Sequence, residues 1–140
     1  MDFVGDVHRM FDTDAQLPGL APGGLYDNVR PPQAPERLTW VTLTYVGTGV
    51  SQYTSGDPYL DGKQLLFSVF GATESSVRAV VTRLKAVYHR GLRGRLSDDE
   101  RVVTVLQGTE NYGVDMVNPD LTRGSLQYIL QTEKVMETPN

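Results

Sequence analysis

The stretch from Asp61 to Arg95 constrains the fold most, because an alternating apolar strand leads there into the clearest amphipathic helix of the chain. In its first half, Leu65, Phe67 and Val69 occupy every second position, which is typical of a strand with a buried face. The second half repeats apolar side chains with a helical period of 3.6 residues, at Val77, Val80, Val81, Leu84, Val87 and Tyr88. The sequence therefore predicts a helix whose apolar side packs against a sheet.

The other segments predict one short helix and four more strands around this unit. A helix is expected within residues 1–17, and apolar patterning predicts strands at residues 25–29, 38–46, 101–107 and 125–135. Residues 108–123 contain Asn118-Pro119-Asp120 and are expected to be irregular. The predicted order is therefore helix, three strands, helix, two strands.

This order predicts an α+β fold, because consecutive strands joined by short connections favour antiparallel pairing. We expect a mostly antiparallel sheet of about four to five strands, with the long helix and the short N-terminal helix packed on one face. The length of 140 residues suits a single domain over residues 1–140. No apolar run approaches the ~20 residues of a membrane span, so no membrane contact is expected.

Residues 47–62 form the longest predicted connection, a hairpin loop with four glycines and one proline. Loops of this length in compact domains tend to be functional. The apolar and acidic side chains of the loop either contact a partner or fold back onto their own domain. These side chains are Tyr53, Asp57, Tyr59, Leu60 and Asp61.

Charge is distributed unevenly along the chain. Residues 1–62 and 96–140 each hold three basic and eight acidic residues, whereas residues 63–95 hold seven basic residues and one acid. The basic helix face is either neutralised by distant acids of the same chain or meets an acidic face of a neighbouring subunit. The second arrangement builds a ring when its rotation closes. The residues predicted for such a subunit contact are Arg78, Arg83, Lys85 and Arg90.

The sequence contains no recognisable catalytic, cofactor or metal motif. It has no cysteine, which excludes disulfides and thiolate sites, and His8 and His89 lack metal-ligand spacing. P-loop, dinucleotide and hydrolase-elbow motifs are also absent. The acidic triplet Asp98-Asp99-Glu100 lacks the spacing of a calcium loop and is interpreted as a solvated turn. We therefore expect no catalytic residues, no metal, no cofactor and no enzymatic activity.

Several short segments resemble those of tail terminator proteins, also called tail-completion or tail-to-head joining proteins, of long-tailed bacteriophages and phage-like particles. The resemblance extends over roughly residues 15–135 and consists of a pattern of elements and turn residues. The segments that carry it are LYDNV at 25–29, RPPQAP at 30–35, the loop end Asp61-Gly62, LFSVFG at 66–71, the helix through Leu84 to Leu92, and residues 120–130.

The resemblance implies a virion structural protein in the neck region of the tail, made in the host cytoplasm. Such proteins form a ring, typically of six subunits, that ends tube polymerisation and joins the tail to the head. The implied partners are other copies of the chain, the tail tube protein, the head connector or stopper protein, the sheath of a contractile tail, and DNA passing through the lumen. An acidic wall would not bind phosphate, so the predicted lumen residues are Asp98, Asp99 and Glu100, with Asp57 and Asp61.

The sequence is also compatible with two other classes of protein. The chain could be another head–tail connector, such as a stopper or adaptor, or a tail-tube-like subunit. Alternatively, it could be a small α+β enzyme or ligand-binding domain with a site built from Tyr26, His89, Tyr112 and Tyr128, which requires a deep pocket with convergent polar groups.

Overall fold

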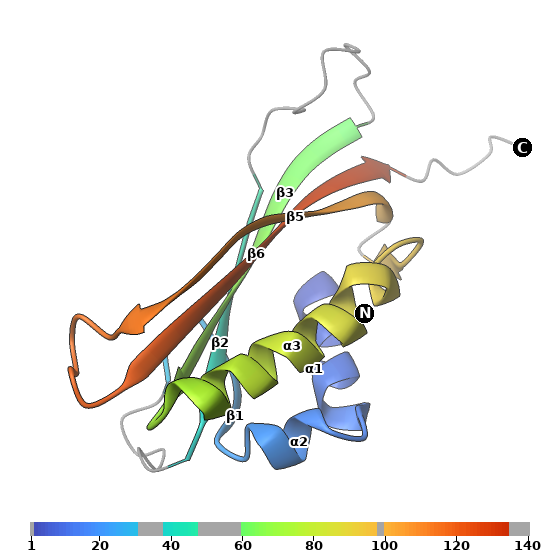
Figure 1. Cartoon of the computed structure of the whole chain (residues 1–140). Helices are drawn as coiled ribbons and strands as arrows, with labels where there is room; N and C mark the ends of the chain where they lie inside the picture. The colour runs from blue at the N-terminus through green and yellow to red at the C-terminus, as the bar shows by residue number, and fades with distance from the viewer. Residues whose placement is uncertain (1, 31–37, 48–59, 98–99, 135–140) are drawn as a thin grey trace, which may run out of the picture.

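The computed structural model describes the chain at residues 2–30, 38–47, 60–97 and 100–134. Within these ranges it has three helices and one six-stranded sheet of order β1-β2-β3-β6-β5-β4 (Figure 1). The elements are α1 (Phe3–Thr13), α2 (Leu17–Leu20), β1 (Gly24–Asp27), β2 (Trp40–Gly47), β3 (Leu60–Gly71), α3 (Glu74–Gly91), β4 (Leu96–Ser97), β5 (Glu100–Val114) and β6 (Thr122–Lys134).

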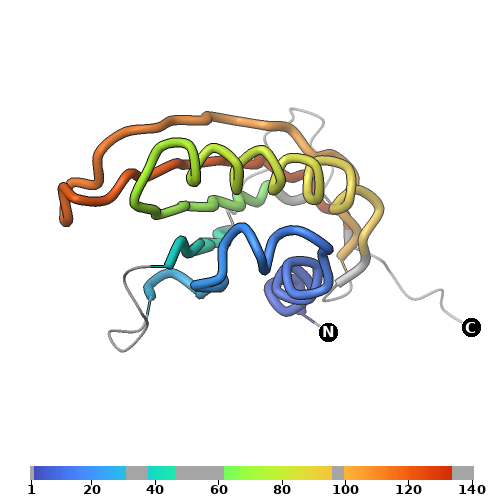
Figure 2. The backbone as a smooth tube through the Cα atoms, turned by 60° about the horizontal axis from the view of Figure 1, so that its bottom comes forward, coloured from blue at the N-terminus to red at the C-terminus, as the bar shows by residue number. Residues whose placement is uncertain are grey.

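The predicted α+β class and the order of the main elements are confirmed. Neighbouring strands pair in antiparallel fashion except β1 and β2, which are parallel. The helices lie on one face of the sheet (Figures 1 and 2). The sheet has six strands, one more than the upper predicted number of five, because the two-residue strand β4 is too short to leave a pattern in the sequence.

Helix α3 is stabilised by a capped N-terminus, by charges that complement the helix dipole, and by burial of its apolar face. Thr73 caps the N-terminus, where its hydroxyl accepts a hydrogen bond from the Ser76 N–H at 3.2 Å. Glu74 lies in the first turn and Arg90 in the last, which complements the helix dipole. The apolar face is buried at Val77, Val80, Val81, Leu84 and Tyr88, each with an exposed fraction of 0%, whereas Val87 is partly buried.

The core lies between this helix face and the centre of the sheet. Phe67 of β3 pairs in register with Leu126 of β6, and both side chains are fully buried. The ring of Phe67 lies 4.8 Å from the ring of Tyr88, measured between centroids. The Tyr88 hydroxyl donates a hydrogen bond to the Val7 carbonyl at 2.7 Å, so a buried polar contact joins α3 to α1.

A glycine allows α3 to lie close to the sheet. Gly124 of β6 is buried under the first turns of α3. A Cβ atom at this position would lie 2.6 Å from Cγ1 of Val77 and 3.2 Å from Cε1 of Tyr112. The close packing of helix and sheet at this point therefore depends on the missing side chain.

The prediction for β5 was wrong in length. The strand runs to Val114 instead of residue 107, because pairing with β6 overrides the low strand propensity of its glycines. A register shift between Val102 and Thr104 makes Val103 an extra residue, and a second shift follows Gln107. Val103 is consequently exposed, whereas Val102 is 2% exposed and belongs to the core.

Among the described residues, the short strand β4 alone lies along the outer edge of β5. This strand pairs with Glu100 and Arg101, and no other described strand pairs with the outer edge as far as Val114. No helix among the described residues combines the length and the apolarity needed to cross a membrane.

Candidate assembly surfaces

The basic side chains predicted for a subunit contact point away from the core, but three of them are engaged within the chain. Arg83 forms two hydrogen bonds with Asp14, at 2.6 and 2.9 Å, and Lys85 pairs with Glu110 at 2.8 Å. Arg78 pairs with Glu74 at 3.1 Å, and its guanidinium carbon lies 3.9 Å from the ring centroid of Tyr112. Distant acids therefore neutralise part of the basic face, as the first of the two interpretations supposed.

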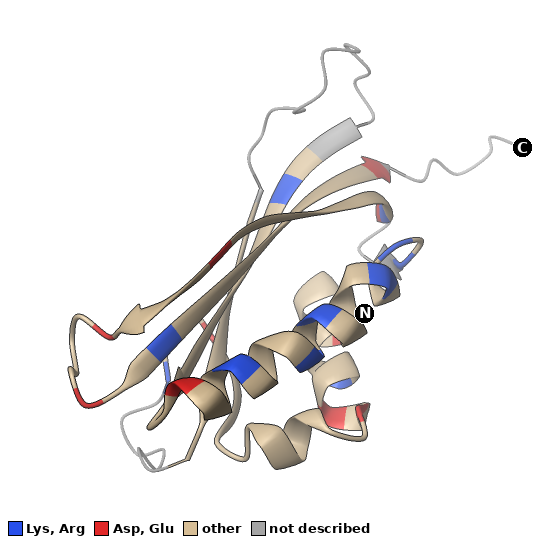
Figure 3. Ribbon diagram, viewed as in Figure 1, with Lys and Arg blue, Asp and Glu red and all other residues tan. Residues whose placement is uncertain are grey.

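Positive charge without an internal partner remains at the C-terminal end of α3. Arg90 and Arg93 are exposed, and neither forms an ion pair with another described residue. Figure 3 shows this end of the helix and the following turn as a group of basic residues. Of the four predicted contact residues, Arg90 is the one that forms no ion pair with another described residue.

Asp14 fixes α2 and α3 relative to each other. Its carboxylate accepts from Arg83 and from the backbone N–H groups of Leu17 at 2.9 Å and Gln16 at 3.0 Å. The bond from Arg83 is the main reason that the pKa of Asp14 lies well below its ordinary value of 3.8, with the backbone bonds adding to it and burial opposing it.

This pair predicts an acid-dependent loss of stability. Because the pKa of Asp14 is lower in the folded chain than its unfolded value, the contribution is complete above about pH 4 and is lost as the pH falls through the folded pKa. Arg83→Met, which keeps the apolar stem, should lower Tm by roughly 4 °C at pH 7, with a smaller difference near pH 2. Thermal unfolding followed by circular dichroism at several pH values measures this.

The matched control is Arg101→Met, which removes an exposed ion pair with Glu133 at 3.7 Å. Exposed pairs of this kind contribute little. A Tm difference for Arg83→Met that is the same at pH 2 and pH 7 would show that the guanidinium does not act through the Asp14 carboxylate.

Most of the predicted loop and lumen residues lie outside the described part of the chain, namely Tyr53, Asp57, Tyr59, Asp98 and Asp99. Leu60 and Asp61 begin β3, where they pair in register with Glu133 and Thr132.

Glu100 is the described member of the acidic triplet, and it is engaged within the sheet. Its Oε2 accepts a hydrogen bond from the Thr132 hydroxyl at 3.1 Å and lies 3.9 Å from Nζ of Lys63. The Glu100 side chain is 22% exposed. Within the described ranges, no group of three or more His, Asp or Glu side chains could hold a metal ion.

Of the four residues of the enzyme-like site that the sequence left open, the structure brings His89 and Tyr128 together, with 6.0 Å between their ring centroids. The Tyr26 hydroxyl on β1 donates to the Gly23 carbonyl at 2.6 Å, whereas His89 lies exposed on α3. Burial raises the pKa of Tyr128 to about 12, and burial together with a hydrogen bond to Glu110 raises that of Tyr112 to about 12. Both phenols are therefore protonated at neutral pH.

The face of the sheet without helices carries an aromatic hollow of about 370 Å³ that sequence reasoning missed. Trp40 of β2 stacks on Phe70 of β3 with 5.0 Å between ring centroids. The guanidinium of Arg30 lies over Trp40 at 4.7 Å, and that of Arg123 lies over Phe70 at 5.7 Å. Residue alternation in β2 and β3 was the signal that could have indicated this face.

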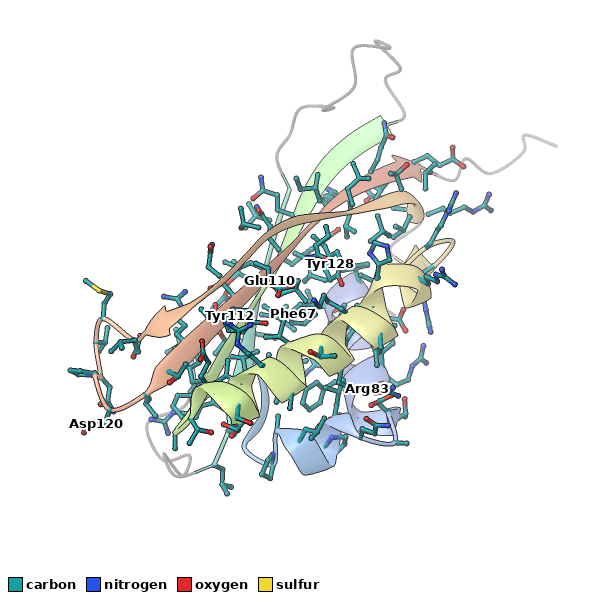
Figure 4. The ribbon with its side chains drawn as sticks, viewed as in Figure 1. Phe67, Arg83, Glu110, Tyr112, Asp120 and Tyr128 are labelled. Carbon is teal, nitrogen blue, oxygen red and sulfur yellow. The ribbon has the colours of Figure 1, made fainter. Side chains whose placement is uncertain are left out.

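The second missed feature is the tip of the β5–β6 hairpin, which we define as residues 114–121. Met116 is 93% exposed, Val117 is 92% exposed and Val114 is 64% exposed. Asp115 is buried, whereas Asp120 is exposed at the end of the hairpin (Figure 4). The sequence predicts a turn at residues 118–120, but it does not indicate that the apolar residues before this turn are exposed.

Comparison with known proteins gave a structural likeness and no sequence match. No family model matches the chain, and no curated protein matches it. The fold is similar to that of a chain in the virion of a native gene transfer agent particle, with a TM-score of 0.70. The two chains are 20% identical over 91% of the length of each, which establishes a shared fold.

Proposed function

We propose that this chain is a virion structural protein that acts as a tail terminator. In this proposal it forms a ring, typically of six subunits, at the head-proximal end of a tail tube. The ring ends tube growth, joins the tail to the head connector and leaves a lumen for DNA. The chain acts through binding surfaces and not through catalysis.

The observation that supports the proposal most is the shared fold. A likeness over 91% of both chains leaves little of either one outside the common structure. The virion context belongs to the gene transfer agent chain, and it agrees with the independent resemblance of LYDNV, LFSVFG and the helix that follows to terminator proteins. Fold alone does not determine function, so the proposal needs a direct test.

The test is negative-stain electron microscopy of particles assembled without this gene. We expect filled heads beside detached tails that are longer than normal and variable in length, because nothing stops tube polymerisation. Supplying the full chain in trans should restore tails of uniform length joined to heads. Tails of normal length attached to heads in the deletion would refute the terminator role.

The same micrographs separate the alternative structural roles. Loss of all tubes would indicate a tail-tube-like subunit, because such a subunit builds the polymer itself. Detached tails of normal length would indicate a connector component, because joining fails while length control persists.

A further inference from the structure

We infer that the tip of the β5–β6 hairpin of one copy docks at the basic end of α3 on a second copy. This inference rests on the proposed ring and names the surfaces that would build it. The basic end is defined by Arg90, Arg93 and the hollow between α1 and α3 beside them.

Hydrogen bonds within the turn hold the tip in one conformation in the isolated chain. The Asp115 N–H donates to the Leu121 carbonyl at 2.9 Å, and the Asp115 carboxylate accepts from the Asn118 N–H at 3.1 Å. The Leu121 N–H donates to the Asn118 carbonyl at 3.0 Å, and the Asn118 side chain accepts from the Asp120 N–H at 3.1 Å. An ordered turn loses little conformational entropy when it binds.

This ordered turn presents apolar side chains to solvent. Met116 and Val117 are both more than 90% exposed, although they are neighbours on a turn held by four hydrogen bonds. Adjacent apolar side chains on a projecting element are typical of an interaction site. Methionine is suited to fill an irregular recess, because its unbranched side chain adapts to the space.

A recess of suitable character lies on the other end of the same molecule. The hollow of about 350 Å³ between α1 and α3 has a mixed lining. Met10, Ala86 and Val87 supply its apolar surface, and Thr13, Asp14, Arg83 and Arg95 supply its polar surface. Arg83 is neutralised by Asp14, and Arg95 contacts Asp6 at 3.2 Å. The arginines Arg90 and Arg93 of the adjoining turn have no such partner among the described residues.

The charges of the two surfaces are complementary. Asp120 is exposed on the tip, and no basic residue occurs from Val114 to Leu121. Figure 3 shows the acidic tip at one end of the molecule and the arginines of the basic end at the other. Complementary potentials steer two surfaces together and fix their register.

The tip and the basic end lie at opposite ends of the molecule, so they cannot contact each other within one chain. Figures 1 and 2 place the tip beyond the end of α3 that begins at Glu74, and the helix from Glu74 to Ala86 spans about 18 Å. In a ring the contact is heterologous, and its head-to-tail repetition gives a closed ring or an open filament, whereas a reciprocal contact between two copies would stop at a dimer.

Cysteine cross-linking tests this contact, since the chain has no cysteine of its own. The full chain carrying both Val117→Cys and Ala86→Cys is produced in particle-forming cells and also purified alone. After mild oxidation, we expect a ladder of dimers, trimers and larger species on non-reducing gels. An intrachain disulfide is excluded, because it requires Cα atoms within about 7 Å.

The controls keep the result specific. Each single-cysteine chain should give nothing larger than a dimer. Val117→Cys combined with Val46→Cys, at an apolar position of β2 that is 51% exposed, should give no ladder. Absence of a ladder from both the particles and the purified chain overturns the inference. A cross-link from the tip to a different virion protein also overturns it, because the second copy is then the wrong partner.

A second measurement uses variants that leave the fold intact. Met116→Ser with Val117→Ser should weaken self-association about 100-fold in sedimentation experiments, because two buried apolar side chains are lost. Asp120→Arg should weaken it a few-fold, and Arg90→Glu with Arg93→Glu in the same chain should restore it. Unchanged association of the serine variant contradicts the inference.

Failure of this contact and failure of the proposed function give different results. Over-long tails in the deletion without a cross-linked ladder would keep the terminator role and reject the contact. A ladder with normal tails in the deletion would keep the contact and reject the terminator role.

Discussion

Leu84→Ala should lower the free energy of unfolding by about 3 kcal/mol. Leu84 is 0% exposed and lies in the middle of the apolar face of α3, in the cluster that joins this helix to the sheet. The substitution removes apolar surface and leaves a cavity that the packed helix and strands fill only in part. A loss of this size is a large fraction of the about 5–15 kcal/mol that stabilises a typical domain.

Urea unfolding followed by circular dichroism measures this effect. We expect a lower midpoint with an unchanged slope, because the substitution alters stability and not the surface exposed on unfolding. Thr82→Ala is the matched control, because Thr82 lies exposed on the other side of the same helix. That variant should be neutral or slightly stabilising. A loss below about 1 kcal/mol for Leu84→Ala would mean that α3 is not the central packing element.

Gly124→Val is the second substitution with a large expected effect, a loss of about 3 kcal/mol. The new Cβ atom would lie 2.6 Å from Cγ1 of Val77, so either α3 moves away from β6 or the side chains leave their preferred rotamers. Both responses weaken the core at the first turns of the helix. The same urea experiment measures the loss.

Gly113→Val is the control for replacing a strand glycine by valine without a steric clash. Gly113 lies opposite Arg123 on the same hairpin, and a Cβ atom there has no neighbour within 4 Å. This variant should be close to neutral. Combining Gly124→Val with Val77→Ala should recover part of the loss, because the two side chains compete for the same space. If the double variant shows no recovery, the cost does not come from contact with Val77.

Local periodicity predicted the central elements well, for a physical reason. The alternation at Leu65, Phe67 and Val69 and the helical repeat from Val77 each report burial on one side of one element. Burial of that kind leaves its pattern within about ten residues of sequence. The α+β class followed from the order of such elements.

The features that sequence reasoning missed depend on pairing between distant segments. The extension of β5 to Val114 is set by its neighbour β6, and the register shifts that expose Val103 have no marker in the strand itself. The hydrogen bond from Arg83 to Asp14 joins residues 69 positions apart in the sequence. Counting charges along the chain does not show which acid a given arginine contacts. The apolar tip was missed because an exposed methionine is recognised only when the turn around it is known.

The long outer edge of β5 has a consequence for how the chain behaves at high concentration. An unpaired strand edge offers its backbone to the strands of other molecules, which is the route to fibres. This edge has few charges, but its two register shifts interrupt the even spacing that an added strand would need. The two register shifts therefore leave an irregular edge, to which a strand of another molecule pairs less readily than to an evenly spaced one.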